Sequence, residues 1–169
     1  MRLKDREVEN KEEIFDILKR CDTVKIAMFG EKYPYVVPVS FGLEIVENKA
    51  IIYFHCAQEG TKLKFLKANS NVCVEAEIFM KTEKTAHGIT ARYESVIGFG
   101  QCEFVSDLKE IIHGLKLLTA HYGYSDYSLE DCAGLNRLVV GEIVLDEIYG
   151  KKNLPNSPTP ADNLDRNIR

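Results

Sequence analysis

The sequence predicts a mainly β protein of the α+β class, a six-stranded antiparallel barrel with helices at its ends and side. About six segments carry β-branched and aromatic residues in the pattern typical of strands. Short turns such as Glu47-Asn48-Lys49 join several of them, which favours hairpins. Only three segments space their apolar residues as a helix does.

The first helix follows a charged arm at residues 1–9. Asn10 can cap it, with Glu13 as a capping-box partner, and the helix should end near Arg20-Cys21. A strand is expected over residues 23–29.

The next predicted strand, residues 33–43, contains Pro38. Proline cannot donate to a sheet ladder, so Pro38 belongs at an edge, a bulge or a strand start. The neighbouring backbone is then free to meet a ligand. An edge strand protected against aggregation explains the proline equally well.

The stretch from residue 50 to 74 predicts a strand, a turn at Gly60, a short helix from Thr61, and another strand. A helix start presents free N–H groups and partial positive charge, to which Thr61 and Lys62 add a hydroxyl and a full charge. That combination suits a phosphate. An ordinary surface helix with solvated lysines is the alternative.

The rest of the chain continues the strand-rich pattern. Gly98 and Gly100 fall on one face of a long strand and predict a bend or a close approach by another group. The expected segments are a strand at 71–79, a polar loop at 80–90, a strand at 91–105, a helix at 107–122, a polar loop at 123–134, a strand at 138–149 and a polar tail from 150.

Composition limits the function classes. A chain of 169 residues with 45% apolar residues and a net charge of −4 suits one folded domain, placed at residues 1–150, with a C-terminal tail at 151–169. The mild acidity argues against nucleic acid as a partner. No apolar run approaches the roughly 20 residues that span a bilayer, so no membrane partner is expected. The charged N-terminus lacks a secretory signal, which favours a cytoplasmic location.

Metal and hydrolase chemistry have little support. The five cysteines are widely spaced without a Cys-x-x-Cys pair, and His113 and His121 have no recognised ligand spacing, so no metal site is expected. No G-x-S-x-G motif is present.

His55 is either a structural histidine or a functional one beside the possible phosphate site. Arg92 and Ser95 either bind an anion or are ordinary polar groups at a sheet edge.

Three ordered segments resemble the flavin-binding split-barrel family related to pyridoxamine 5′-phosphate oxidase, and its 5-nitroimidazole-resistance branch in particular. They are YPYVVPVSFGLE at 33–44, IIYFHCAQEGTKLKFLKANSNVCVE at 51–75 and RYESVIGFGQCEFV at 92–105. The resemblance extends over about residues 10–150. The chain lacks tryptophan and the arginine-rich C-terminal signature of true pyridoxamine phosphate oxidases, so vitamin B6 oxidation is not expected.

The resemblance implies a homodimer with flavin at the interface, FMN being the expected cofactor and FAD the alternative. Carried over to this chain, it assigns Thr61 and Lys62 to the flavin phosphate and His55 to a catalytic position near the flavin. The other implied cofactor-binding residues are Pro38, Val39 and Ser40 along the ring, Tyr93 and Ser95 on the adjacent strand, and Lys151 reaching the partner's flavin.

The expected activity is oxidoreduction of a small organic substrate, such as a nitroimidazole, with NAD(P)H as the possible electron donor. The flavin would carry the redox chemistry and the protein would position it. Two alternatives remain open from the sequence: a non-catalytic module that stores or senses flavin or haem, and a cofactor-free barrel that acts through its dimer surface.

Overall fold

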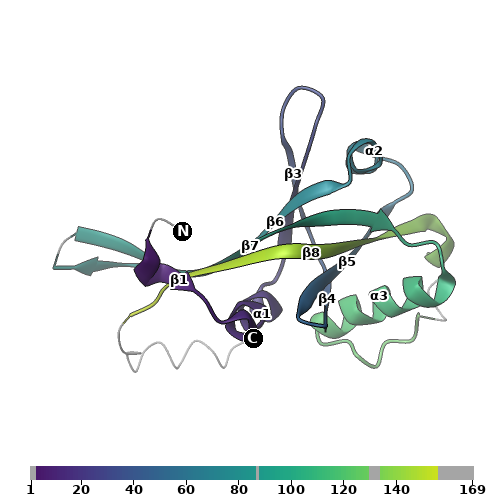
Figure 1. Ribbon diagram of the computed structural model, residues 1–169. Coiled ribbons are helices and arrows are strands. Elements are labelled where there is room, and N and C mark those ends of the chain that lie inside the picture. The colour runs from purple at the N-terminus through teal and green to yellow at the C-terminus, as the bar shows by residue number, and fades with distance from the viewer. Residues whose placement is uncertain (1–2, 87, 130–133, 156–169) are drawn as a thin grey trace.

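The computed structural model describes residues 3–86, 88–129 and 134–155 (Figure 1). One curved antiparallel sheet dominates it, with α1 and α3 packed against the sheet and α2 joining two strands. In chain order the elements are a 3-10 turn Lys4–Arg6, β1 Glu7–Val8, α1 Lys11–Arg20, β2 Val24–Met28, β3 Tyr35–Val39, β4 Gly42–Val46, β5 Lys49–Ala57, α2 Thr61–Ala68, β6 Asn71–Thr85, β7 Gly88–Phe104, α3 Leu108–His121, a 3-10 turn Leu135–Arg137 and β8 Leu138–Asn153.

The sheet order is β3-β2-β6-β7-β8-β5-β4, and β1 pairs with β8. Its two edges, β3 and β4, do not pair with each other, so the barrel remains open. The predicted class, mainly β and antiparallel with flanking helices, is confirmed. Within the described residues the sheet has eight strands rather than six. The predicted strand 33–43 divides at Ser40-Phe41, and the charged N-terminal segment at 1–9 contributes β1.

The division between β3 and β4 is fixed by the end of α3. Phe41 is fully buried, and its ring centroid lies 4.3 Å from that of His121. The hydroxyl of Tyr122 donates to the carbonyl of Asp22 over 2.6 Å and accepts from the Phe41 N–H over 3.3 Å. The chain therefore turns inward at Phe41 instead of continuing as one strand.

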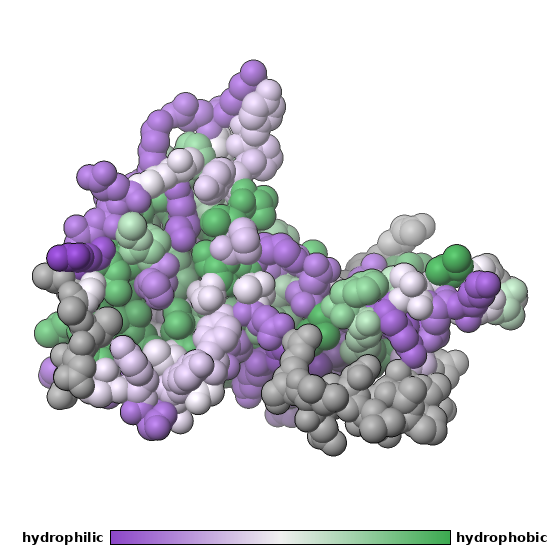
Figure 2. Space-filling view, turned by 180° about the vertical axis from the view of Figure 1, so that it is seen from behind, coloured by the Kyte–Doolittle hydropathy of each residue, from purple (hydrophilic) through white to green (hydrophobic). Residues whose placement is uncertain are grey.

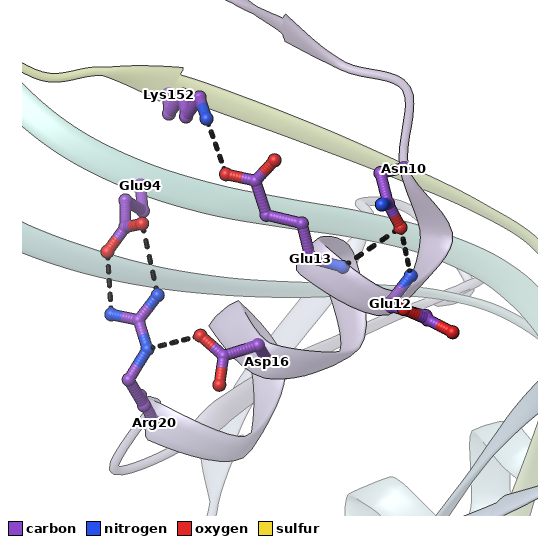
Figure 3. A network of polar contacts seen from close by, with 7 residues as sticks. All are labelled: Asn10, Glu12, Glu13, Asp16, Arg20, Glu94 and Lys152. Atoms are coloured by element: carbon purple, nitrogen blue, oxygen red, sulfur yellow. Dashed lines mark hydrogen bonds and ion pairs between the residues drawn. The ribbon is translucent and has the colours of Figure 1, made fainter.

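Helix α1 closes the barrel from below. The side chain of Asn10 accepts hydrogen bonds from the backbone of Glu12 and Glu13 over 2.8 and 3.4 Å, which confirms the predicted cap (Figure 3). The Glu13 carboxylate, predicted as the capping-box partner of Asn10, pairs instead with Lys152. The apolar stripe of α1 joins the core through Ile14, Phe15, Ile17 and Leu18.

The predicted loop at 80–90 is wrong. Its described residues, 80–86 and 88–90, lie at the ends of β6 and β7, which continue as a two-stranded hairpin that projects from the barrel (Figure 1). We call this hairpin, from position 79 to 93, the arm. Its polar sequence suggested a loop, but cross-strand contacts hold it as a ladder. Arg92 Nε donates to Glu83 over 2.7 Å, and Asn153 donates to Thr90 over 3.0 Å.

Strand β8 is longer than predicted, ending at Asn153 instead of position 149. Its last residues pair with β1 on one side and with β7 on the other, so they stay in the ladder despite their polarity. The rest of the predicted tail, 156–169, lies outside the described residues, as does part of the predicted loop at 123–134.

The close approach predicted at Gly98 and Gly100 is confirmed, because a Cβ at Gly100 would lie 1.9 Å from the Val144 carbonyl oxygen.

Candidate functional site

The start of α2 differs from the starts of the other two α-helices. Asn10 caps α1 and Asp107 caps α3 through side-chain hydrogen bonds. Helix α2 begins after Gly60, whose φ of 144° suits glycine and which has no side chain to cap the helix. The N-cap residue therefore offers no side-chain acceptor to the first N–H groups of α2, which start at the exposed Thr61, and such a helix start suits an anion.

Lys62 adds a charge that the described part of the chain does not neutralise. Its Nζ lies 5.0 Å from the ring centroid of Phe54, and no carboxylate in the described residues pairs with it. Lys64, two positions on, is paired with Glu31. A half-buried ammonium over an aromatic ring at an uncapped helix start makes this end of the barrel electropositive.

His55 belongs to the same group. It is exposed near the end of β5, on the face that carries Tyr53, while Cys56 turns to the interior. Partial desolvation, and then the charge of Lys62, lower the pKa of His55. The structure thus brings Thr61, Lys62 and His55 together.

Strand β3 is an edge strand, as Pro38 predicted. Pro38 lies opposite Lys25, Val39 lies opposite Val24, and Ser40 is exposed just after the strand. The other end of β3 reaches α2, where the rings of Tyr35 and Phe65 meet at 5.5 Å. Pro38, Val39 and Ser40 therefore lie at the end of this edge strand that is away from the Tyr35 contact with α2.

Tyr93, Ser95 and Lys151 form a second group. Ser95 and Lys151 are directly opposed on β7 and β8, and Lys151 Nζ lies 5.8 Å from the Tyr93 ring centroid. His55 is opposed to Val140 on the same β8. Positions 140 and 151 are on the order of 35 Å apart along the strand. One chain does not unite the two groups.

Arg92 has a structural role. Besides Glu83, it donates to the side chain of Asn153 over 3.1 Å and to the carbonyl of Leu154 over 3.0 Å. These contacts favour the reading of Arg92 as an ordinary polar group, which ties β7 to the end of β8, and they occupy the donors that an anion would need.

The outward side of β2, β6, β7 and β8, here called the outer face, holds a pocket that the sequence did not predict. The pocket has a volume of about 510 Å³ and lies in the row formed by Ala27, Cys73, Phe99 and Glu147. Phe29 and Pro34 also line it. Apolar surface gathers on the body of the molecule and again on the arm (Figure 2). Such a pocket depends on four strands meeting, which no local sequence signal reports.

The position of the Phe54 ring next to Lys62 was also not predicted from the sequence. Its alternation with His55 predicts only an inward side chain, and the fold places that ring under Lys62. Within the described residues no three His, Cys, Asp or Glu side chains gather as metal ligands would, and no helix is long and apolar enough to cross a bilayer.

Comparison with known proteins agrees with this fold. The family model described as pyridoxamine 5′-phosphate oxidase matches residues 10–152, and the chain belongs to that family. No curated protein matches the chain.

Several solved structures share the split-barrel architecture. A candidate 5-nitroimidazole antibiotic resistance protein from Bacteroides thetaiotaomicron is 29% identical, with a TM-score of 0.76 over 86% of this chain and 85% of its own. The FAD and haem binding protein from Mycobacterium smegmatis is 16% identical, with a TM-score of 0.74 over 95% of this chain and 80% of its own. An FAD-binding protein from Mesorhizobium loti is 19% identical, with a TM-score of 0.65 over 88% and 97%.

Proposed function

We propose that this protein is a flavin-dependent oxidoreductase that works as a homodimer, with FMN, or alternatively FAD, as cofactor. The observation that carries the proposal is the unneutralised Lys62 at the uncapped start of α2, in a chain of the pyridoxamine 5′-phosphate oxidase family. Thr61, Lys62 and the first N–H groups of α2 would hold the flavin phosphate. The backbone of Pro38, Val39 and Ser40 would flank the ring.

The separation of the two residue groups supports a site shared between two copies. Tyr93, Ser95 and Lys151 lie on the outer face, far along β8 from the strand position that pairs with His55. The outer face also exposes large apolar side chains, among them Ile97, Phe99 and Tyr149. If two copies pack through this face, the second group of one copy can reach the first group of the other.

The flavin, when bound, supplies the two-electron chemistry between donor and acceptor. NAD(P)H is oxidised by loss of a hydride, and a nitro acceptor takes up two electrons and two protons to give a nitroso group and water. Lys62 and desolvation lower the pKa of His55 in the free protein. A phosphate on Lys62 offsets that repulsion, so His55 can hold a proton nearer neutral pH and donate it to the acceptor.

The similarity to the 5-nitroimidazole resistance protein supports a nitro compound as acceptor. The test is the absorbance spectrum of the purified protein before and after anaerobic addition of NADH or NADPH. Flavin bands that bleach on addition agree with a reductase. Bands that persist point to storage or sensing, a Soret band points to haem, and absence of any band after reconstitution contradicts the proposal.

Two charge reversals locate the phosphate. Lys62→Glu should abolish flavin retention, whereas Lys64→Glu should retain it, because the Lys64 charge is already paired with Glu31. His55→Ala should keep flavin and slow turnover. A Lys62→Glu protein that stays yellow would refute the phosphate assignment, and unchanged turnover would remove His55 from the mechanism.

A further inference from the structure

The register of β2 and β3 shows which way the backbone of the predicted ring-binding segment points. Pro38 lies opposite Lys25, and Val39 lies opposite Val24. Directly opposed residues in an antiparallel ladder alternate between pairs that exchange hydrogen bonds and pairs that do not. Pro38 has no N–H to donate, so it belongs to a pair that does not. By the same alternation, the N–H and C=O of Ser40 turn away from β2, toward the open edge of the described sheet.

A tyrosine hydroxyl replaces the next rung of this ladder. Continuing the register by two residues places Asp22 opposite Phe41, in a pair that would exchange hydrogen bonds. Both groups bond to the hydroxyl of Tyr122 instead. It donates to the Asp22 carbonyl over 2.6 Å and accepts from the Phe41 N–H over 3.3 Å. A direct N–H···O=C bond would be about 2.9 Å long, so the inserted hydroxyl holds the two strand ends apart.

The end of α3 also keeps this gap from closing. The ring centroid of Phe41 lies 4.3 Å from that of His121. A Cβ at Gly42 would lie 2.5 Å from the backbone nitrogen of Leu118, so α3 packs directly on the corner between β3 and β4. On the β2 side, His121 Nε2 lies 2.9 Å from the carbonyl oxygen of Cys21. Both strand ends are therefore fixed to α3 and not only to each other.

The hydroxyl has a consequence for the residue between the two fixed points. Ser40 lies between Val39, the last residue paired in the ladder, and Phe41, which α3 holds. It is exposed, and its backbone groups face the open edge. Only a group that both donates and accepts can bridge a carbonyl and an N–H, which a tyrosine hydroxyl does and a phenylalanine ring does not.

We propose that Tyr122 is a positioning residue of the flavin site. By replacing a rung of the β2–β3 ladder, its hydroxyl holds Ser40 at the open edge of β3, where the Ser40 backbone bonds to the bound ring. The inference rests on the proposed function, in which Pro38, Val39 and Ser40 flank the flavin. It adds to the site the end of α3, which carries none of the residues that the sequence assigned to the cofactor.

Hydrogen exchange in the flavin-free protein tests the rung itself. Tyr122→Phe removes the hydroxyl and keeps the ring, which lies 5.0 Å from that of His121. The Phe41 amide should then exchange about tenfold faster, whereas the Val37 amide, inside the ladder, should not change. Tyr127→Phe deletes the same atom from a tyrosine that is 50% exposed on the following loop, and it should leave both amides unchanged.

Flavin titration tests the positioning role. The dissociation constant of FMN should rise about tenfold in Tyr122→Phe and stay unchanged in Tyr127→Phe, with FAD titrated in parallel. At saturating FMN the absorbance spectrum of the bound flavin should also differ from that of the parent, because the hydrogen bonds to the ring change. A merely less stable fold lowers the fraction of protein that binds but leaves the spectrum of bound flavin as it was. Thermal denaturation verifies that each variant is folded at the temperature of the titration.

A measurement on the parent protein needs no variant. Saturating FMN should slow exchange of the Ser40 amide, which faces the open edge in the free protein, and should leave the Val37 amide unchanged. This result is available even if Tyr122→Phe does not fold.

The outcomes separate this inference from the proposed function. Faster exchange at Phe41 with weaker FMN binding and an altered spectrum supports the positioning role. FMN that binds to Tyr122→Phe with the affinity and spectrum of the parent overturns that role and leaves the proposed function intact, as does a Ser40 amide that FMN does not protect. A parent protein that binds neither FMN nor FAD overturns the proposed function, and the positioning role with it.

Discussion

The guanidinium of Arg20 holds the buried carboxylate of Glu94 through two hydrogen bonds of 2.6 and 3.0 Å (Figure 3). Arg20 also donates from Nε to Asp16 over 2.9 Å, and its pKa is raised first by the hydrogen bond with Glu94. The fork geometry satisfies both carboxylate oxygens. The pair fastens the end of α1 across β7, next to Ser95 of the candidate site.

Arg20→Ala should lower the free energy of unfolding by about 3 kcal/mol, because it leaves a buried carboxylate without its partner. Urea denaturation at neutral pH measures the change. Lys19→Ala, one residue earlier on the exposed side of α1, is the matched control and should stay within about 0.5 kcal/mol of the parent.

Adding Glu94→Gln to Arg20→Ala should restore part of the lost stability, since the uncompensated charge is then absent. If Arg20→Ala lowers the free energy of unfolding no more than Lys19→Ala does, other groups in the folded chain must solvate the Glu94 carboxylate.

Local patterns predicted most of the fold. Asn10 at the start of α1 and the apolar alternation of β2 and β6 act over a few residues, and each appears where the sequence placed it. The arm was missed because its strands are held by contacts such as Arg92 with Glu83 and Asn153. The contact with Asn153 joins residues 61 positions apart, and a polar composition alone reveals neither contact.

The candidate site was predictable to the same degree. The turn at Gly60 followed by Thr61 and Lys62 is a local signal, and the structure places it at an uncapped helix start. The ring of Phe54 beneath Lys62 depends on how β5 meets α2. The distance along β8 between the two residue groups follows from strand register, which short-range patterns do not fix.

The pKa of His55 should rise when the charge of Lys62 is removed. Desolvation and Lys62 both lower it in the parent, so Lys62→Gln removes the second cause and leaves the first. NMR titration of the His55 ring protons measures the shift. Inorganic phosphate should raise the pKa of His55 in the parent and have less effect in Lys62→Gln. Equal responses in both proteins would place the anion elsewhere.

The same shift gives a pH dependence of stability. A histidine whose pKa is lowered on folding binds its proton more readily in the unfolded chain. Its contribution is therefore fully favourable above the unfolded pKa of about 6.5 and is lost as the pH falls toward the folded value. The stability lost between pH 7.5 and 5 that is due to His55 is the part that His55→Ala removes. Thermal denaturation should show that this part is smaller in Lys62→Gln than in the parent.

Gly141→Ala should destabilise the barrel and disturb Lys62. A Cβ at Gly141 would lie 2.5 Å from the Phe54 ring, which must then move from its place beneath Lys62. We expect a loss of about 1–3 kcal/mol in unfolding free energy together with weaker flavin retention. Gly134→Ala, where a Cβ meets nothing within 4 Å, is the control. If the two variants have equal free energies of unfolding, β8 accommodates a Cβ at position 141 without loss of stability.

The buried thiols should resist alkylation in the native protein. Burial raises the pKa values of Cys21 and Cys102 to about 12, so only about one molecule in ten thousand carries either thiolate at pH 8. Cys56 and Cys73 are less buried, so iodoacetamide followed by peptide mapping should label them before Cys21 and Cys102. Cys102 reacting as fast as Cys56 would indicate that the barrel opens locally.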